Sequence, residues 1–494
     1  MQEVELKLEL SEAAADAVQA SGLLPGLPTI TPLHAVYYDT PKLALRNAGL
    51  SLRIRRTGDL AIQTIKAAGP GTAGLFARSE WEQPVEGEAP ELDETNPITM
   101  LLGEKTRKLV PSFEVLVERR AWMIRQDDAE IELILDRGRV IAGERDSPVC
   151  EIELELRSGA AAALFAAGRE LEAATPVRIG VLTKSERGYL LREPEPRAYK
   201  AEPVHLAGDA TAAQALQAIA QSCLRQFRLN EDLLARTRAA EPLHQARVAI
   251  RRLRSAFSIY RPLISVDPRS GELAGELRWL AAQLGEARDL DVLLGRLEAS
   301  ELHDRVQAER AAAYDHLAQL LDTRRVRRLM LEVLAWLHGG EWLRAEATEP
   351  LRHQDARAFA AAALDRLRRK MKKAGPALAG PDDEVRHDVR KDAKKLRYAA
   401  EFFDTLFDDK AEKRRRKRFQ AALQDLQEQL GTLNDMATAP GLLDRLDAAG
   451  HPQAQSLEAG EEKDALIRAA VAAHARLVEA KPFWRLQAKA QPAA

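Results

Sequence analysis

The chain opens with MQEVELKLEL (residues 1–10), and this stretch decides the fold expected for the first 200 residues. Charged side chains at positions 3, 5, 7 and 9 alternate with apolar side chains at positions 4, 6, 8 and 10. Because successive side chains leave a β-strand on opposite faces, the charged residues form one row along one face. A single row of this kind is most simply explained by a half-buried strand whose polar face meets water. Whether this charged row faces water or an enclosed interior depends on the pattern of the remaining strands.

Nearly every other predicted strand in this half carries a charged row of its own. SLRIRR (residues 51–56) places Arg53 and Arg55 on one face, IQTIK (62–66) adds Lys66, and VCEIELEL (149–156) aligns three glutamates. Acids gather on the first and late strands, whereas bases dominate the rows around Arg53. A sheet closed into a barrel would place these rows inside, because interior and exterior residues alternate along barrel strands. Burying so many charges is costly unless they are paired or hold ions.

The chemistry of such an enclosed set narrows its ligand. Clustered carboxylates supply the hard oxygen ligands that Mg²⁺ and Mn²⁺ prefer, and clustered Arg and Lys complement phosphate oxygens. Phosphoryl transfer depends mostly on positioning and charge stabilisation, which this set can provide. The rows therefore predict a substrate with several phosphates, together with a divalent metal. The sequence has no GxxxxGK[ST], GxGxxG or HExxH motif, which argues against P-loop, dinucleotide-binding and zincin chemistry.

These segments resemble the CYTH domain of the triphosphate tunnel metalloenzymes. The resemblance rests on the opening E-x-E-x-K, on YYDTP and SLRIRR, on R-x-E at residues 78–80, on the aspartate of ILD, on the EIE row and on the lysine of TKSERGY, and it covers residues 1–192. It implies an eight-stranded antiparallel β-tunnel with covering helices, which hydrolyses a triphosphate with Mg²⁺ or Mn²⁺ as the cofactor.

The resemblance also implies roles for individual residues. Metal ligands are expected at Glu3, Glu5, Glu80, Asp136, Glu151 and Glu153. Phosphate-binding side chains are expected at Lys7, Arg53, Arg55, Lys66, Arg78, Arg119 and Lys184. Catalysis is expected of Glu5, Lys7 and Lys66. Strand parity alone does not decide between Arg119 and Arg120, and only the family pattern favours Arg119. The row extensions Glu9, Glu82 and Glu155 are candidates for the tunnel mouth.

Composition sets the limits of any wider function. The length of 494 residues predicts two or three domains, and a net charge of -2 excludes a chain that is basic throughout, as in nucleic-acid binders. Two distant cysteines exclude a disulfide framework and a cysteine-rich zinc site. The charged start does not resemble a secretory signal, and no apolar run approaches the roughly 20 residues that span a bilayer. We expect a cytoplasmic protein without a membrane partner.

The composition changes after REPEPRAYKAEP (residues 192–203), which we interpret as a linker between domains at 1–197 and 205–490. Beyond it, apolar residues recur at helical spacing, so the second domain is expected to be an all-α duplicated helical bundle. HQARVAIRRLR starts at residue 244 and HDVRKDAKKLR at residue 387, and LGEARDLD at 284 is matched by LGTLNDMA at 430. Two matched motifs in the same order indicate duplication.

Each copy of the first motif would place basic residues along one side of a helix. A solvated charged face is the usual fate of such a stripe, but its duplication with the histidine retained favours a cleft that binds a polyanion. The expected polyphosphate-binding residues are His244, Arg247, Arg251, Arg252, Arg254, Arg288, His387, Arg390, Lys394, Lys395 and Arg397. The basic run KAEKRRRKR (residues 410–418) is interpreted as a solvated helix face.

This half resembles the CHAD domain, a conserved-histidine helical module, through both His-x-x-Arg motifs and the LGxxxD segments, over about residues 210–485. The resemblance implies paired helical bundles that bind inorganic polyphosphate, and it makes polyphosphate granules a candidate location within the cytoplasm. The leading function is hydrolysis of inorganic tripolyphosphate to pyrophosphate and phosphate. A nucleotide cyclase, a thiamine triphosphatase and a non-enzymatic polyphosphate-binding or targeting protein are the alternatives. Nucleic acid is not expected as the partner, although basic stripes alone do not exclude it.

Overall fold

The computed structural model describes residues 2–58, 60–67, 73–94, 96–448, 451–452 and 460–485, without the side chains of 2, 3, 77–79, 439 and 460–462. The chain divides into two compact units. The first comprises residues 1–199 and 321–340, and the second comprises residues 200–320 and 341–494. The change from one unit to the other after residue 199 falls within the segment predicted as a linker. The predicted domain limits, 1–197 and 205–490, stay a prediction.

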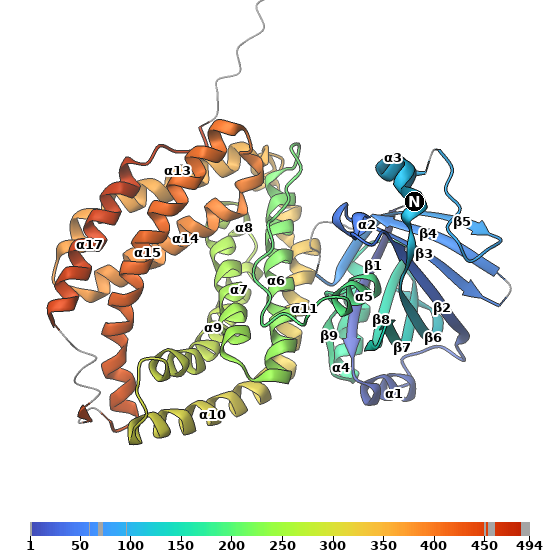
Figure 1. Cartoon of the computed structure of the whole chain (residues 1–494), viewed down its shortest axis with the longest axis horizontal. Helices are drawn as coiled ribbons and strands as arrows, with labels where there is room; N and C mark the ends of the chain where they lie inside the picture. Colours follow the sequence, from blue (N-terminus) through green and yellow to red (C-terminus); the bar gives the residue numbers. More distant parts are fainter. Residues whose placement is uncertain are drawn as a thin grey trace, which may run out of the picture. The chain divides into compact units, whose positions relative to one another are not determined.

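The first unit is built on an antiparallel sheet that curls and closes on itself (Figure 1). Its strands are β1 (Gln2–Leu10), β2 (Thr29–Asp39), β3 (Leu50–Thr57), β4 (Leu60–Ala67), β5 (Leu75–Val85), β6 (Val110–Gln126), β7 (Ala129–Ala142), β8 (Arg145–Ser158) and β9 (Val177–Ile179). They are ordered β5-β4-β3-β2-β6-β7-β8-β1-β9, and an additional β1–β5 pairing closes the eight long strands into a ring. The predicted antiparallel tunnel is therefore confirmed, with the short β9 as an addition beside β1.

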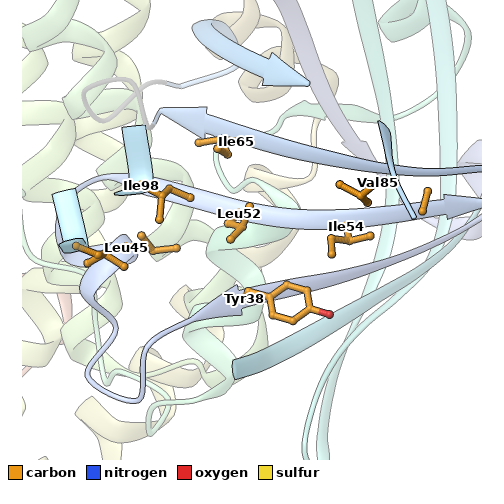
Figure 2. Packing of buried hydrophobic residues seen from close by; sticks show 9 residues of the cluster. Tyr38, Leu45, Leu52, Ile54, Ile65, Val85 and Ile98 are labelled. Atoms are coloured by element: carbon orange, nitrogen blue, oxygen red, sulfur yellow. The ribbon is translucent and has the colours of Figure 1, made fainter. Parts of the chain in front are cut away.

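Apolar side chains on the outer face of the ring pack under short helices. Leu52, Ile54 and Ile65 of β3 and β4 are buried with Leu45 of α2 and Ile98 of α3 (Figure 2). Their immediate neighbours along the strands, including the predicted phosphate-binding residues of β3 and β4, line a cavity inside the ring. The strand alternation thus places apolar rows outside and charged rows inside, the reverse of an ordinary sheet with one wet face.

One part of the barrel interior is apolar rather than charged. Tyr37 of β2 stacks on Phe113 of β6 with ring centroids 4.6 Å apart, and Tyr189 of α5 meets Phe113 edge-on at 5.0 Å. Valines at 115, 117, 140 and 149, which face inward by strand parity, are buried in the same cluster. Helix α5 therefore packs into the barrel with its apolar side chains.

The helices of the first unit include one that comes from far along the chain. They are α1 (Glu12–Ala20), α2 (Ala44–Asn47), α3 (Pro97–Leu102), α4 (Ala162–Ala174), α5 (Lys184–Leu191) and α11 (Arg324–Gly339). The sequence prediction placed residues 324–339 in the second domain, but α11 packs on α4 and β9 of the first unit. Its apolar face, with Leu331 and Leu334 fully or nearly fully buried, accounts for this placement.

The second unit is helical throughout its described elements, as predicted (Figure 1). Its α-helices are α6 (Ala212–Thr237), α7 (Ala240–Ile259), α8 (Arg261–Ile264), α9 (Arg269–Leu294), α10 (Glu301–Leu321), α12 (Glu349–Arg352), α13 (Ala356–Ala374), α14 (Asp383–Phe402), α15 (Lys410–Arg445) and α17 (Gly460–Glu479). Helix α7 carries the first His-x-x-Arg motif and packs on α9, which carries LGEARDLD. In the same way α14 packs on α15, and α7 packs on α14. The described helices include none that is both long enough and apolar enough to cross a bilayer.

Candidate active site and polyanion cavity

A polar cavity of about 350 Å³ lies inside the barrel. It brings together the following predicted residues: Glu5, Lys7, Arg53, Arg55, Lys66, Glu80, Arg119, Glu153 and Lys184. Arg119, favoured over Arg120 only by the family pattern, is the one that faces inward. The side chains of the predicted Glu3 and Arg78 lie outside the described residues, although their backbones pair opposite each other in β1 and β5.

Two lysines and two glutamates form the most buried part of this site. Lys7 Nζ lies 2.7 Å from Glu151 Oε1 and also pairs with Glu153. Lys184 Nζ lies 2.5 Å from Glu151 Oε1 and 3.0 Å from Glu153 Oε1. Lys7 comes from β1, the glutamates from β8, and Lys184 from the first residue of α5, where a capping box of Thr183 and Glu186 fixes the helix start. The capping box thereby holds Lys184 against the glutamates.

Asp136 and Arg119 extend this network across the neighbouring strands. Arg119 Nε donates to Asp136 Oδ1 at 2.9 Å and Nη2 donates to Oδ2 at 2.7 Å, a bidentate pair. Arg119 Nη2 also reaches Glu153 Oε2 at 3.1 Å, and Lys184 Nζ lies 2.7 Å from Asp136 Oδ2. Asp136 and Glu151 are fully buried and lie behind the side chains that line the cavity.

Burial and pairing pull the pKa values of these groups in opposite directions. Burial raises the pKa of Glu153, but Lys184 and Lys7 outweigh it and hold that pKa well below its usual value. Burial lowers the pKa of Lys184, but Asp136 and Glu151 raise it well above its usual value. The acids and lysines are therefore charged together at neutral pH. Such a network is sensitive to the loss of any one member, because the remaining buried charges lose their partner.

The opposite wall of the cavity is basic. Lys66 Nζ lies 3.2 Å from Glu80 Oε1, and Arg55 Nη2 lies 3.7 Å from Glu82 Oε1. Arg53 Nη2 is 4.0 Å from the same Glu80 oxygen. The two arginine pairs are longer than the lysine pairs of the buried network, and Arg53 also forms a hydrogen bond with the Tyr37 side chain.

Among the side chains that the structure describes, two groups of acids could hold a divalent metal. One comprises Glu5, Glu153 and Glu155, and the other comprises Asp136, Glu151 and Glu153; within each group, one ligand oxygen per residue lies within 4.8 Å of the others. Oε2 of Glu151 is buried and accepts no hydrogen bond from any residue that the structure describes, an arrangement that a bound cation would relieve. The all-oxygen donor set fits Mg²⁺ or Mn²⁺. Glu80, also predicted as a ligand, belongs to neither group and faces the basic wall.

The sequence prediction missed several residues of this site. Glu155 was considered only for the tunnel mouth, yet it joins the first acidic group. The other cavity-lining polar residues outside the predicted set are Tyr37, Ser51, Thr64, Glu82, Glu132, Arg157, Thr183 and Ser185. Strand parity identifies those on strands, because they continue inward-facing rows. Thr183 and Ser185 follow β9 at the start of α5, where no alternation exists to reveal them.

A second cavity, of about 910 Å³, lies in the helical unit. Its lining contains the following predicted residues: His244, Arg247, Arg251, Arg288, His387, Arg390, Lys394 and Arg397. They come from both copies of the repeat, which confirms that the two copies face a common space. Arg296 and Arg445 also line it and were not predicted.

Within each copy, the two matched segments of the repeat lie in contact. In the first copy Arg247 Nη1 lies 3.2 Å from Asp289 Oδ1, and in the second His387 Nδ1 lies 2.6 Å from Asn434 Oδ1. Arg251 Nε also donates to the hydroxyl of the buried Tyr398 at 2.7 Å. Burial together with Arg251 and Arg390 lowers the pKa of Lys394 to about 6.

Three predicted basic residues do not line the cavity. Arg252 is buried and pairs with Glu401 at 3.1 Å, while its guanidinium lies over the Phe402 ring. Lys395 and Arg254 likewise lie outside the cavity lining. Arg252 and Lys395 follow Arg251 and Lys394 by one position, about 100° around each helix, and therefore face elsewhere.

Two family models match the chain: the one described as CYTH domain matches residues 1–189, and the one described as CHAD domain matches residues 218–444. A curated relative, the inorganic triphosphatase of Haemophilus influenzae, is 30% identical over 196 residues, which make up 39% of this chain and 55% of the relative. The chain thus spans little more than half of that relative's length.

Solved structures similar to the chain fall on both halves. The CHAD domain from the plant Ricinus communis is 30% identical with a TM-score of 0.47, and the match covers 56% of this chain and 96% of that one. The Hippeastrum protein HpAC1, for which a dominant triphosphatase activity is described, is 18% identical with a TM-score of 0.29, covering 38% of this chain and 95% of that one. From the family matches, the chain carries a CYTH domain at residues 1–189 followed by a CHAD domain at residues 218–444.

Proposed function

We propose that the barrel hydrolyses inorganic triphosphate to pyrophosphate and phosphate in a metal-dependent reaction. The observation that carries the proposal is a cavity inside the barrel with an acidic group on one side and a basic wall on the other. A bound triphosphate needs both walls, because its negative charge is balanced partly by protein cations and partly by a metal that the acids would hold. The H. influenzae relative, named an inorganic triphosphatase, supports the same reaction class for this chain.

The roles of individual residues follow from the two walls. Arg53, Arg55 and Lys66 would bind phosphate oxygens from the basic wall. Lys7 and Lys184 would stabilise negative charge that develops next to Glu153. Glu5, Glu153 and Glu155, or Asp136, Glu151 and Glu153, would hold the metal. The chemistry that a bound divalent metal supplies is neutralisation of phosphate charge and activation of water.

The helical unit is proposed to bind inorganic polyphosphate in its cavity. Several cations from α7, α9, α14 and α15 converge there, and few carboxylates oppose them. A flexible chain of phosphates can contact many separate cations at once, so it suits a cavity of about 910 Å³ lined by many basic residues better than a single compact anion does. Competition between short RNA and polyphosphate at matched salt would separate this ligand from a nucleic-acid backbone.

Release of orthophosphate from tripolyphosphate by the full-length chain tests the enzymatic proposal. With Mg²⁺ or Mn²⁺ we expect release much faster than from ATP, and with excess chelator we expect none. Pyrophosphate formed from ATP without orthophosphate would indicate a cyclase instead. No release from tripolyphosphate, thiamine triphosphate or ATP with either metal would leave a binding protein.

The affinity for polyphosphate is expected to fall as the pH rises above 6. At pH 7.5 the protein is expected to take up a proton when polyphosphate binds. Lys394, whose pKa is about 6, is mostly neutral at pH 7.5 in the free protein. A bound anion favours its protonated, charged form. The charged groups next to Lys394 are Arg247, Arg251 and Arg390, which lower its pKa, and Asp435, which raises it. Calorimetry in buffers with different ionisation enthalpies measures the proton uptake. Lys394→Arg should remove most of it, and equal uptake in that variant would assign the effect to another group.

A further inference from the structure

Lys7 lies where strand β1 exchanges one neighbour for another. Residues 2–6 of β1 pair with β5, and residues 8–10 pair with β9. Between these pairings, Lys7 N donates to Gly74 O at 2.8 Å, Gly180 N donates to Lys7 O at 2.8 Å, and Gly74 N donates to Gly180 O at 2.9 Å. Lys7, Gly74 and Gly180, here called the Lys7 corner, therefore form a closed ring of peptide hydrogen bonds. This ring fixes the backbone from which Lys7 reaches Glu151 and Glu153.

The Lys7 corner has no room for further side-chain atoms. A Cβ on Gly180 would lie 2.6 Å from Cγ of Lys7. A Cβ on Gly74 would collide with Leu334 of α11, and Gly74 has a φ of 72° that other residues rarely adopt. Helix α11 thus packs directly on the corner, with Leu334 also lying next to Ile179 of β9.

Further contacts attach α11 to the same side of the barrel. Leu331 lies beside Gly168 of α4, whose own neighbour is Leu6 of β1. The His338 ring stacks on Phe165 of α4 with centroids 6.2 Å apart. Ion pairs flank this apolar contact: Arg169 pairs with Glu332 at 2.9 Å, and Glu172 pairs with Arg324 at 3.1 Å and with Arg327 at 3.8 Å. Apolar packing and ion pairs therefore act together to hold α11 in one register on α4 and β9.

We propose that α11 is a positioning element of the barrel site, with Leu334 as the positioning residue that holds the Lys7 corner. A helix supplied by residues 324–339 thereby determines where the Lys7 ammonium lies relative to Glu151 and Glu153. A displacement of about 1 Å at such a group is enough to cost a large factor in rate. The kinetic part of this inference rests on the proposed triphosphatase function, and the structural part does not.

Leu334→Ala in the full-length chain tests the kinetic part. We expect kcat for tripolyphosphate to fall about tenfold while KM changes less than about threefold, because the basic wall still binds phosphate. Leu334→Met should restore kcat to within about twofold, since methionine fills the same space. Gly180→Ala, which displaces the Lys7 side chain without touching α11, should lower kcat at least as much.

Ile98→Ala is the matched control. Ile98 is as fully buried as Leu334 but belongs to the outer cluster shown in Figure 2, away from the Lys7 corner. It should lower the Tm by a similar amount and leave kcat within about twofold at 20 °C. An equal loss of kcat in Leu334→Ala and Ile98→Ala would reduce α11 to a source of general stability and overturn the proposal. If Leu334→Ala does not fold, Leu334→Val takes its place in every comparison.

Hydrogen exchange of the Lys7, Gly74 and Gly180 amides gives a readout that needs no activity. We expect these three amides to exchange at least about tenfold faster in Leu334→Ala than in the unchanged chain, and no such change in Ile98→Ala. Unchanged exchange in Leu334→Ala would overturn the inference even if the enzyme is active. If the chain releases no phosphate from any triphosphate, the proposed function fails, and the exchange comparison still decides whether α11 holds the corner.

Discussion

Glu153→Gln is expected to lower kcat/KM for inorganic triphosphate on the order of 10³-fold. Glu153 is the residue that both acidic groups share, so a neutral amide there weakens either possible metal site. The same carboxylate pairs with Lys7, Lys184 and Arg119, and its loss leaves two buried lysines and a partly buried arginine with less opposing charge. Orthophosphate release over a range of metal concentrations measures the effect, and circular dichroism verifies that the variant is folded.

Glu132→Gln is the appropriate control for this experiment. Glu132 lines the same cavity and pairs with Arg157, but it belongs to neither acidic group. We expect Glu132→Gln to lower kcat/KM by less than about tenfold, because an exposed ion pair at the cavity wall contributes little. If saturating Mg²⁺ restored full turnover to Glu153→Gln, or if both variants lost activity equally, the assignment of Glu153 to the metal would be wrong.

The double variant Arg247→Glu/Arg251→Glu is expected to weaken polyphosphate binding at least about 100-fold at moderate salt. Two charge-assisted contacts of about 1.5 kcal/mol each account for that factor before repulsion is added. The dependence of log Kd on log salt should also become shallower by about two, because two fewer phosphates are neutralised. Titration of a labelled polyphosphate at several salt concentrations measures both quantities, and triphosphate hydrolysis should be unchanged.

Arg254→Glu/Lys395→Glu makes the same change in formal net charge, with one substitution on α7 and one on α14. Both side chains lie outside the cavity lining, so we expect a loss of affinity below about fivefold from the long-range field alone. Equal losses in the two double variants would mean that the helical unit attracts polyanions through its overall charge. That outcome would remove any special role of the cavity.

The sequence was most informative where side chains alternate strictly. The rows of SLRIRR and EIELEL place Arg53 and Arg55, and Glu151 and Glu153, on the inner side of the barrel, as parity predicts. Each side chain of a strand points to one of two faces. Once a charged row is assigned to the inner face, every other residue of that strand is assigned as well. The register of the strands, which brings Lys7 opposite Glu153, depends on pairings between distant segments and could not be inferred from any one of them.

Prediction was weaker for the helices, where a residue has more than two directions to face. Arg251 and Arg252 both looked like members of one basic stripe, yet the first lines the cavity and the second is buried against Glu401 and Phe402. The position of α11 was missed for a related reason. Its apolar periodicity indicates that it packs on something, but the pattern does not specify which domain provides the contact.

The contribution of α11 to the first unit has a consequence for the order of events during synthesis. When residue 199 has been translated, the surface of α4, β9 and the Lys7 corner still lacks the helix that covers it. That helix ends at residue 339, so about 140 more residues must be added first, which takes roughly 7 to 28 s at ribosomal rates of about 5 to 20 residues per second. During this interval an apolar patch of a nearly complete barrel is open to chaperones and to other nascent chains, and the barrel reaches its final form only after much of the helical half has been made.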